Sequence, residues 1–266
     1  MRFNFHTHTT FSDGKNTPEE VLQTALSFGF SSIGFSDHGF TPYDTRYCMK
    51  DEDGYVAEIH RLKEKYKGKI EVYLGVEEDS RAQVDRSKFD YIIGSCHYIT
   101  AGDRTLVLDS NYDYFSKCLA ACGGDELALA KAYYEPFVQY ILQRRPDVIG
   151  HFDLLTKFDE KEKDRFLSSE TYWRLAQFYT QEALRAGSIF EVNTGLITRG
   201  YRTMPCPHEK LLSIIKTGGG KVTLSSDSHA AETIEKNFEQ AKQILQDVGF
   251  DSVYALSGGK WTKIRL

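Results

Sequence analysis

The stretch FNFHTHTTFSDGKNTPEE, residues 3–20, joins a short apolar segment, two closely spaced histidines and the beginning of a helix. His6 and His8 are two residues apart, so on an extended strand their side chains share a face and can meet at one point. Thr17 and Glu20 predict a helix start with a capping box. The stretch therefore predicts a strand that ends in potential metal ligands and leads into a helix.

Short apolar segments rich in β-branched residues recur between helical patterns. Seven of them predict strands, at 2–5, 31–36, 70–76, 90–95, 147–150, 188–193 and 221–226, with 252–257 as an eighth candidate. Beyond the first helix, helical patterns cover 53–66, 126–144, 168–186, 207–217 and 232–248. This alternation indicates an α/β fold of parallel strands with right-handed crossovers, either a barrel or a doubly wound sheet.

Nothing along the chain marks a second domain, so we expect one domain over residues 1–266. The longest connection between predicted elements, residues 98–125, is expected to form a lid or binding loop. Its aromatic residues could enclose part of a substrate or serve as packing anchors; they are Tyr98, Tyr112, Tyr114 and Phe115.

The composition argues against several classes of protein. There is no apolar run near the roughly 20 residues of a membrane span, and the first residues do not resemble a signal peptide, so we expect a cytoplasmic protein. The formal net charge of −5 disfavours nucleic acid as a partner. The five cysteines are odd in number and lack zinc-ribbon spacing, which favours reduced, mostly buried thiols.

Most histidines fall at the carboxyl ends of predicted strands, where the loops of parallel α/β folds converge into active sites. These are His6, His8, His38, His97, His151 and His229, whereas His60 and His208 lie elsewhere. Carboxylates occupy the same edge: Asp13, Asp37, Glu77, Glu78, Asp153, Glu191 and Asp227. Imidazole and carboxylate ligands with little thiolate suit zinc, manganese or iron, and their number predicts two to three divalent ions. Asp37 could instead cap a turn, and Glu78 should face away from Glu77.

The motifs HTHTTFSDG, FSDHG, LGVEED, GSCHY, GHFDL, FEVNTG and SSDSHA occur in this order between residues 6 and 229. Together they resemble the polymerase and histidinol phosphatase (PHP) family, and the closest likeness is to its histidinol-phosphate phosphatases. The resemblance implies a distorted TIM-like barrel of seven β/α units with a trinuclear metal centre. It therefore favours the barrel over the doubly wound sheet.

The resemblance also implies a ligand set. His6 and His8 with Glu77 and Asp227 would hold the first metal, and Glu77 would bridge to a second bound by His97 and His151. The third would be held by Asp13, His38 and His229, and Arg199 would grip the substrate phosphate. The implied reaction is hydrolysis of L-histidinol phosphate to L-histidinol and phosphate, a step of histidine biosynthesis.

Several roles follow from this chemistry as expectations. A hydroxide between the first two metals would attack phosphorus, while the third metal and Arg199 bind the other phosphoryl oxygens. Asp153 could protonate the leaving alkoxide or orient a metal-bound imidazole. Glu191 and Asn193 share a strand face and would structure the cluster or, like His38, meet the substrate.

Two other functions stay open at this point. A PHP phosphoesterase could act on a different small phosphate monoester or nucleotide. A metal-binding domain without catalytic activity is a second alternative, although the full ligand set is present. The sequence does not indicate an oligomeric state.

Overall fold

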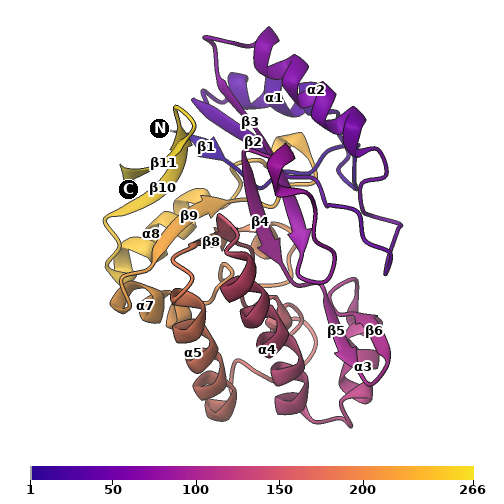
Figure 1. Cartoon of the computed structure of the whole chain (residues 1–266). Helices are drawn as coiled ribbons and strands as arrows, with labels where there is room; N and C mark the ends of the chain where they lie inside the picture. The colour runs from indigo at the N-terminus through magenta and orange to yellow at the C-terminus, as the bar shows by residue number, and fades with distance from the viewer. Residues whose placement is uncertain (1) are drawn as a thin grey trace.

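Seven parallel strands form one sheet in a computed structural model that describes residues 2–266 (Figure 1). Their spatial order is β1-β2-β3-β4-β7-β8-β9, so strands that pair follow one another in the chain. The strands are β1 (Phe3–Asn4), β2 (Ser32–Phe35), β3 (Glu71–Asp79), β4 (Tyr91–Ser95), β7 (Val148–Ile149), β8 (Ile189–Asn193) and β9 (Lys221–Ser225). The seven strands predicted from sequence are therefore confirmed, with small differences at their ends.

The two outer strands of this sheet meet just beyond their carboxyl ends, at the opening histidine pair. The His8 N–H donates to the Ser228 carbonyl at 2.8 Å, and the Ser228 N–H donates to the His6 carbonyl at 3.3 Å. Thr7 and Ser228 form an isolated parallel bridge at the same place. The sheet is thus a nearly closed, distorted seven-stranded barrel, which confirms the prediction of a barrel over a doubly wound sheet.

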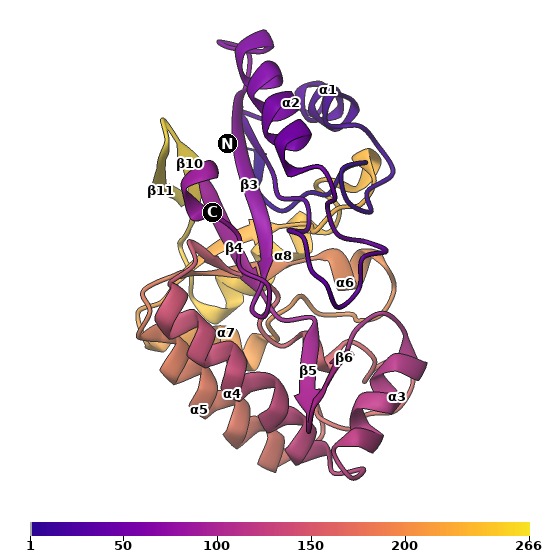
Figure 2. The same ribbon diagram turned by 45° about the vertical axis from the view of Figure 1, so that its right-hand side comes forward.

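Helices cover the outside of the barrel. They are α1 (Pro18–Ser27), α2 (Glu52–Lys65), α4 (Glu126–Arg144), α5 (Glu170–Leu184), the short α6 (Gly195–Thr198), α7 (Glu209–Thr217) and α8 (Phe238–Val248). Figures 1 and 2 show α4, α5 and α7 packed together on one side and α1 with α2 on another. Helix α1 begins as predicted, with the capping box between Thr17 and Glu20 formed in both directions. None of the described helices is both long and apolar enough to cross a membrane.

The segment 98–125, predicted as a lid or binding loop, contains regular secondary structure instead. β5 (Tyr98–Ala101) and β6 (Arg104–Val107) form an antiparallel hairpin, and α3 (Tyr112–Ala121) follows. The hairpin and α3 lie together beside α4 (Figure 2). The sequence did not indicate these elements because each hairpin strand has only four residues, too few for a clear alternating pattern. The expected binding role agrees with the segment's contribution of Val107, Asp109 and Ser110 to a cavity wall.

Two further differences occur near the carboxyl end. The predicted helix 232–248 is divided into a 3₁₀ turn, Ala231–Thr233, and α8, because Asn237 adopts a left-handed φ of 64°. The candidate eighth strand is real as β10 (Ser252–Ser257), but it pairs antiparallel with β11 (Lys260–Arg265) and takes no part in the barrel sheet.

The β10–β11 hairpin closes the amino-terminal end of the barrel with an aromatic side chain. The Trp261 ring lies 5.4 Å from the ring of Phe5 and 6.1 Å from that of Tyr91, measured between centroids. Inside the barrel, the Tyr91 hydroxyl donates to the Phe5 carbonyl at 2.6 Å. A methyl group at Gly75 would lie 2.2 Å from the Tyr91 ring, so the glycine provides the space that this ring fills. The ligand edge is thus left as the open end of the barrel.

Tyr91→Phe should destabilise the protein by about 1–3 kcal/mol, because it leaves the buried Phe5 carbonyl without its donor. The measurement is the free energy of unfolding in urea. Tyr254→Phe is the matched control, since the half-buried Tyr254 hydroxyl has no hydrogen-bond partner among residues 2–266. Equal stability of the two variants would show that the Tyr91 hydroxyl does not hold the barrel.

Candidate metal centre

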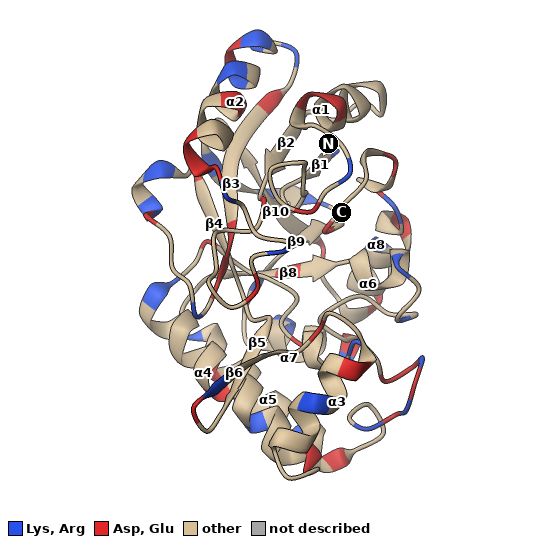
Figure 3. Ribbon diagram, turned by 90° about the vertical axis from the view of Figure 1, so that its right-hand side faces the viewer, with Lys and Arg blue, Asp and Glu red and all other residues tan. Residues whose placement is uncertain are grey.

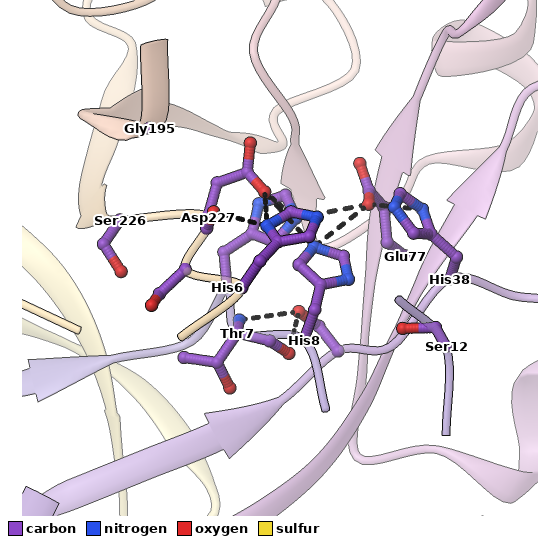
Figure 4. Close-up of polar contacts among 12 residues, drawn as sticks. His6, Thr7, His8, Ser12, His38, Glu77, Gly195, Ser226 and Asp227 are labelled. Atoms are coloured by element: carbon purple, nitrogen blue, oxygen red, sulfur yellow. Dashed lines mark hydrogen bonds and ion pairs between the residues drawn. The ribbon is translucent and has the colours of Figure 1, made fainter. Parts of the chain in front are cut away.

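The nine predicted metal ligands converge at the open end of the barrel. Each stands at or just beyond the carboxyl end of a strand or in the loop that follows it, as Figure 4 shows for five of them. The set is His6, His8 and Asp13 after β1, His38 after β2, Glu77 within β3, His97 after β4, His151 after β7, and Asp227 and His229 after β9. Positions far apart in sequence meet here because parallel strands all end at this edge. In Figure 3 the carboxyl end of β3 is acidic.

Glu77 lies at the centre of this cluster, and its two oxygens face different histidines. Oε2 is 3.3 Å from His6 Nε2 and 3.5 Å from His8 Nε2. Oε1 is 2.8 Å from His151 Nε2 and 3.4 Å from His97 Nε2. Oε2 also lies 2.8 Å from His38 Nδ1. The carboxylate therefore stands between two groups of imidazoles, which is the arrangement expected of a ligand that bridges two ions.

A third group of ligands surrounds His8 on the side nearer the solvent. The His8 ring packs between those of His38 and His229, with centroid distances of 4.3 and 4.2 Å. Asp13 Oδ2 lies 3.3 Å from His229 Nε2, and Asp13 Oδ1 lies 3.8 Å from His38 Nε2. One ligand atom from each of these four residues falls within 4.8 Å of the others, a spacing suited to a single ion.

Several ring nitrogens of this cluster have no hydrogen-bond partner, and this supports metal binding. Among the described residues, His6 Nε2, both nitrogens of His8 and His151 Nδ1 are buried without a hydrogen-bond partner. Buried polar atoms normally have such partners, because leaving one unpaired costs free energy. A cation beside the one nitrogen of each neutral ring that carries a lone pair would satisfy that atom, so the residues present fit divalent ions.

The charges of the cluster also suit a cation. Burial alone would raise the pKa of Glu77, but the neighbouring His38, His6 and His97 hold it well below the usual value. Burial opposes the ionisation of Asp227 too, and Arg199 keeps its pKa well below the usual value. Burial and the adjacent imidazoles lower the pKa of His8 to about 3, so its ring is neutral near pH 7 and offers a lone pair. Ionised carboxylates and a neutral imidazole are the states in which these groups bind metals.

A second layer of carboxylates orients the histidines. Glu191 Oε1 bonds to His6 Nδ1, and Glu191 Oε2 accepts from the His151 backbone N–H at 2.8 Å. Asp79 Oδ2 lies 3.3 Å from His97 Nδ1 and accepts from the His97 N–H at 2.9 Å. Such partners fix the tautomer and the direction of a ligating imidazole. Asp79 was missed from sequence, although it shares a strand face with Glu77 and that spacing could have indicated it.

Glu191 and Asn193 take the first of their two expected roles. Both are buried and neither lines the cavity. The Asn193 amide donates to Glu191 Oε2 at 3.0 Å, and its oxygen accepts from the Gly195 N–H at 2.8 Å. They structure the cluster from behind, and the expectation that they meet the substrate is corrected by this placement.

Asp153 does not occupy the place of a proton donor. Its carboxylate is fully buried and absent from the cavity lining. It accepts from the Cys206 thiol, from the His208 backbone N–H at 3.0 Å and from Arg202 Nη1 at 3.3 Å. The expectation that it protonates a leaving group is therefore corrected, and it orients no imidazole in the described structure either.

The remaining acidic and histidine candidates lie outside the ligand cluster, and most make contacts that stabilise the fold. Asp37 accepts from Thr9 and Ser12 and so caps the turn before Asp13. Glu78 turns away from the cluster to Arg144. His60 is exposed on α2, and His208 caps α7.

A cavity of about 340 Å³ opens in front of the metal ligands. Arg199 lines it from the end of α6, with Nη2 2.8 Å from Asp227 Oδ2 and a side chain that is 32% exposed. Asp227 itself has a left-handed φ of 49°, a strained conformation of the kind that occurs at functional sites.

No sequence pattern marked the other residues of the cavity wall, most of which lie in loops. They are Asp44, Tyr47, Val107, Asp109, Ser110, Leu154, Lys157 and Tyr201. Lys157 Nζ lies 3.6 Å from Asp109 Oδ2 and 4.8 Å from the Tyr201 ring centroid. Tyr98, Tyr112, Tyr114 and Phe115, considered as walls of a substrate pocket, are not among the lining residues. Phe115 is part of the core, and Tyr98 contacts Tyr47 through its hydroxyl.

The chain is similar to known proteins over most of its length. The family model described as the PHP domain matches residues 4–195. A Schizosaccharomyces pombe protein named "probable histidinol-phosphatase" is 31% identical over 91% of this chain and 84% of its own.

Two solved structures share the fold. One, from Listeria monocytogenes and described as a candidate histidinol phosphatase, has a TM-score of 0.78 and 18% identity, covering 90% of this chain and 99% of its own. The other is histidinol phosphate phosphatase from Lactococcus lactis in complex with zinc, L-histidinol and phosphate. Its TM-score is 0.69 and its identity 22%, over 98% of this chain and 99% of its own.

Removing divalent metal with a chelator should lower the melting temperature, because the ions bind the folded cluster and leave its charges uncompensated when they go. Ions present at about 1,000 times their Kd would contribute about 4 kcal/mol, or roughly 10 °C for a chain of this size. Differential scanning calorimetry before and after chelation, and after metal is restored, measures the change. Asp227→Asn should show a smaller shift, and an unchanged melting temperature for the unaltered protein would argue against the metal centre.

Proposed function

This chain belongs to the PHP domain family, and we propose that it hydrolyses L-histidinol phosphate to L-histidinol and phosphate with two to three divalent ions, zinc, manganese or iron. The observation that carries the proposal is the position of Glu77 between two groups of imidazoles, beside a cavity that also contains Arg199. The resemblance to the S. pombe protein over nearly the whole chain supports the substrate.

The ligand groups define three positions for metal ions. His6, His8, Glu77 and Asp227 would hold one ion, Glu77, His97 and His151 a second, and Asp13, His38 and His229 a third. Bound ions would lower the pKa of water from 15.7 to roughly 7 and neutralise phosphoryl oxygens, which answers the two difficulties of monoester hydrolysis. Glu191 and Asp79 hold the His6 and His97 rings in the direction that this binding requires.

Arg199 is suited to bind the phosphate oxygens that the ions leave free. Two of its five N–H donors are used on Asp227, on the carbonyl at 2.9 Å and on Oδ2 at 2.8 Å, and the rest are available. Its planar fork pairs with phosphate better than a lysine does. Lys157 adds a second positive charge to the cavity wall.

The opposite charge in the cavity wall suits the rest of the substrate. Asp44 and Asp109 line the cavity, and none of the three proposed metals uses them. Arg46 already pairs with Asp44, whereas Asp109 has only Lys157 at 3.6 Å as an ion-pair partner among residues 2–266. A carboxylate in a phosphate site favours an ester that carries a cationic group, such as the amine of histidinol. We also propose that the chain works in the cytoplasm, where a charged, water-soluble substrate would be found. We propose further that it forms one domain over residues 1–266.

The second candidate is a phosphoesterase of the same family with another small monoester as substrate. The metal ligands and Arg199 would serve any such ester, so the discrimination depends on the loop residues of the cavity wall.

A phosphate-release assay should show a kcat/KM for L-histidinol phosphate at least about 100-fold above that for sugar phosphates and nucleotides, since ester recognition by a placed carboxylate is worth up to about 3 kcal/mol. Metal content is measured on the same preparation, and Asp227→Asn is the inactive control. Equal rates on all esters would refute the substrate while leaving the phosphatase, and no phosphate release by fully metallated protein would refute both.

Arg199→Ala should raise KM and lower kcat, with a loss of about 10- to 100-fold in kcat/KM, because a charge-assisted bond to phosphate that tightens in the transition state is removed. Arg185→Ala is the control, as Arg185 is exposed on the outer surface and pairs only with Glu182 among the described residues. Steady-state kinetics of the two variants provide the comparison. Kinetics unchanged by Arg199→Ala would remove this arginine from the site.

A further inference from the structure

The loops that follow β7 and β8 each carry residues of the cavity wall that face the substrate site. The first, residues 150–169, contributes Leu154 and Lys157, and the second, residues 194–208, contributes Arg199 and Tyr201. The second loop is bound to β8 by the backbone bridge between Asn193 and Cys206, whereas Arg199 and Tyr201 lie in the segment before that bridge. A contact that joins this segment to the first loop would fix its position further.

Asp153 provides that contact. Its three hydrogen-bond donors all come from the second loop: the Cys206 thiol, the His208 backbone N–H and the Arg202 guanidinium. Arg202 Nη1 also donates to Thr156 Oγ1 at 2.6 Å, and Thr156 Oγ1 donates to the Asp153 carbonyl at 2.8 Å. Both oxygens of the Asp153 carboxylate thus accept hydrogen bonds from the second loop.

The burial of this pair makes the contact specific. The side chains of Asp153 and Arg202 are both 0% exposed, although a charged pair gains little stability from burial compared with apolar residues. Burial raises the pKa of the Cys206 thiol, which therefore stays protonated and donates to Asp153. Removing the carboxylate would leave the buried Arg202 with only the more distant Glu160, whose Oε1 lies 3.7 Å from Arg202 Nε, so the second loop would lose its closest ionic contact with the first.

We propose that Asp153 is a positioning residue that acts through Arg199: by fixing the loop 194–208 it holds the Arg199 guanidinium toward the phosphate. The inference rests on the proposed phosphatase function. Arg202 is only three residues from Arg199, and Gly200 between them has a left-handed φ of 73°, so the chain turns sharply from the buried anchor to the cavity. Arg199 is itself held at one side only, by Asp227. Loss of the anchor would free the guanidinium to leave the phosphate position.

The test is a double-mutant cycle with Asp153→Asn and Arg199→Ala, measured on p-nitrophenyl phosphate and L-histidinol phosphate with metal content checked for each variant. Asp153→Asn should raise KM and the inhibition constant of inorganic phosphate about 10-fold on both esters. Added to Arg199→Ala, it should cost little more, because both changes remove one interaction. Asp159→Asn is the matched control, since Asp159 is equally buried but accepts from Phe166 and Leu167 and not from the loop 194–208.

Three results would overturn the proposal. Losses that add in the double variant would mean that Asp153 does not act through Arg199. A loss in kcat that is large for L-histidinol phosphate and absent for p-nitrophenyl phosphate, whose leaving group needs no proton, would make Asp153 a general acid. A loss of stability equal to that of Asp159→Asn, with an unchanged phosphate inhibition constant, would make its role purely structural.

Limited trypsin digestion provides a readout that does not require activity. Asp153→Asn should be cleaved after Arg199 or Arg202 at least about 10-fold faster than the unaltered protein, and Asp159→Asn should not. Cleavage as slow as in the unaltered protein would show that the loop does not depend on Asp153. If no ester is hydrolysed by any variant, the proposed function fails, while this digestion still decides whether Asp153 anchors the loop.

Discussion

The buried negative charge of Glu77 is the constraint on which the rest of this structure depends. Its side chain is 1% exposed, and a carboxylate so far from water is stable only where positive charge or metal lies on every side. Imidazoles from the ends of four other strands supply those surroundings, and they can do so only if the barrel closes. Closure occurs through the backbone of His6 and His8 against Ser228, so the first ligand pair and the last barrel contact are the same residues. Folding and metal binding are therefore linked in this chain.

The buried carboxylate behind the ligands also needs partners on every side. Glu191 is buried and needs donors, and it finds them in His6, the His151 backbone and Asn193. Each donor is a ligand or is bound to the segment that holds one. The left-handed backbone of Asp227 is a cost of the same kind, which the bonds from Arg199 to its carboxylate and carbonyl offset. The polar interior at this end is thus a connected network, and the apolar seal of Phe5, Tyr91 and Trp261 lies at the other end.

What the sequence could predict was the part of the fold that repeats. Strand after strand ended in a histidine or carboxylate, and that regularity was enough to bring together residues from His6 to His229. Residues whose side chains could point either into the protein or toward the cavity were harder to place. Nothing local distinguishes Asp153, which turns into the protein, from Asp13, which faces His38 and His229, because the direction of a loop side chain is fixed only by the segment that packs against it. The same holds for Asp109 and Lys157, which reach the cavity because β5, β6 and α3 set the course of their loop, and those short elements gave no clear periodicity.

This difference reflects how the two halves of the site are supported. Most of the proposed metal ligands stand at or just beyond the ends of strands, whose hydrogen bonds fix the nearby backbone, so their places can be derived from strand order. The substrate-facing residues are held by loops, and loops keep one position only if buried bonds select it. In this chain the selecting bonds are ionic, between Asp153 and Arg202, and they contribute specificity of position more than stability. A barrel built this way can change its substrate by changing loops and their buried anchors while Glu77 and its imidazoles stay where the strands put them.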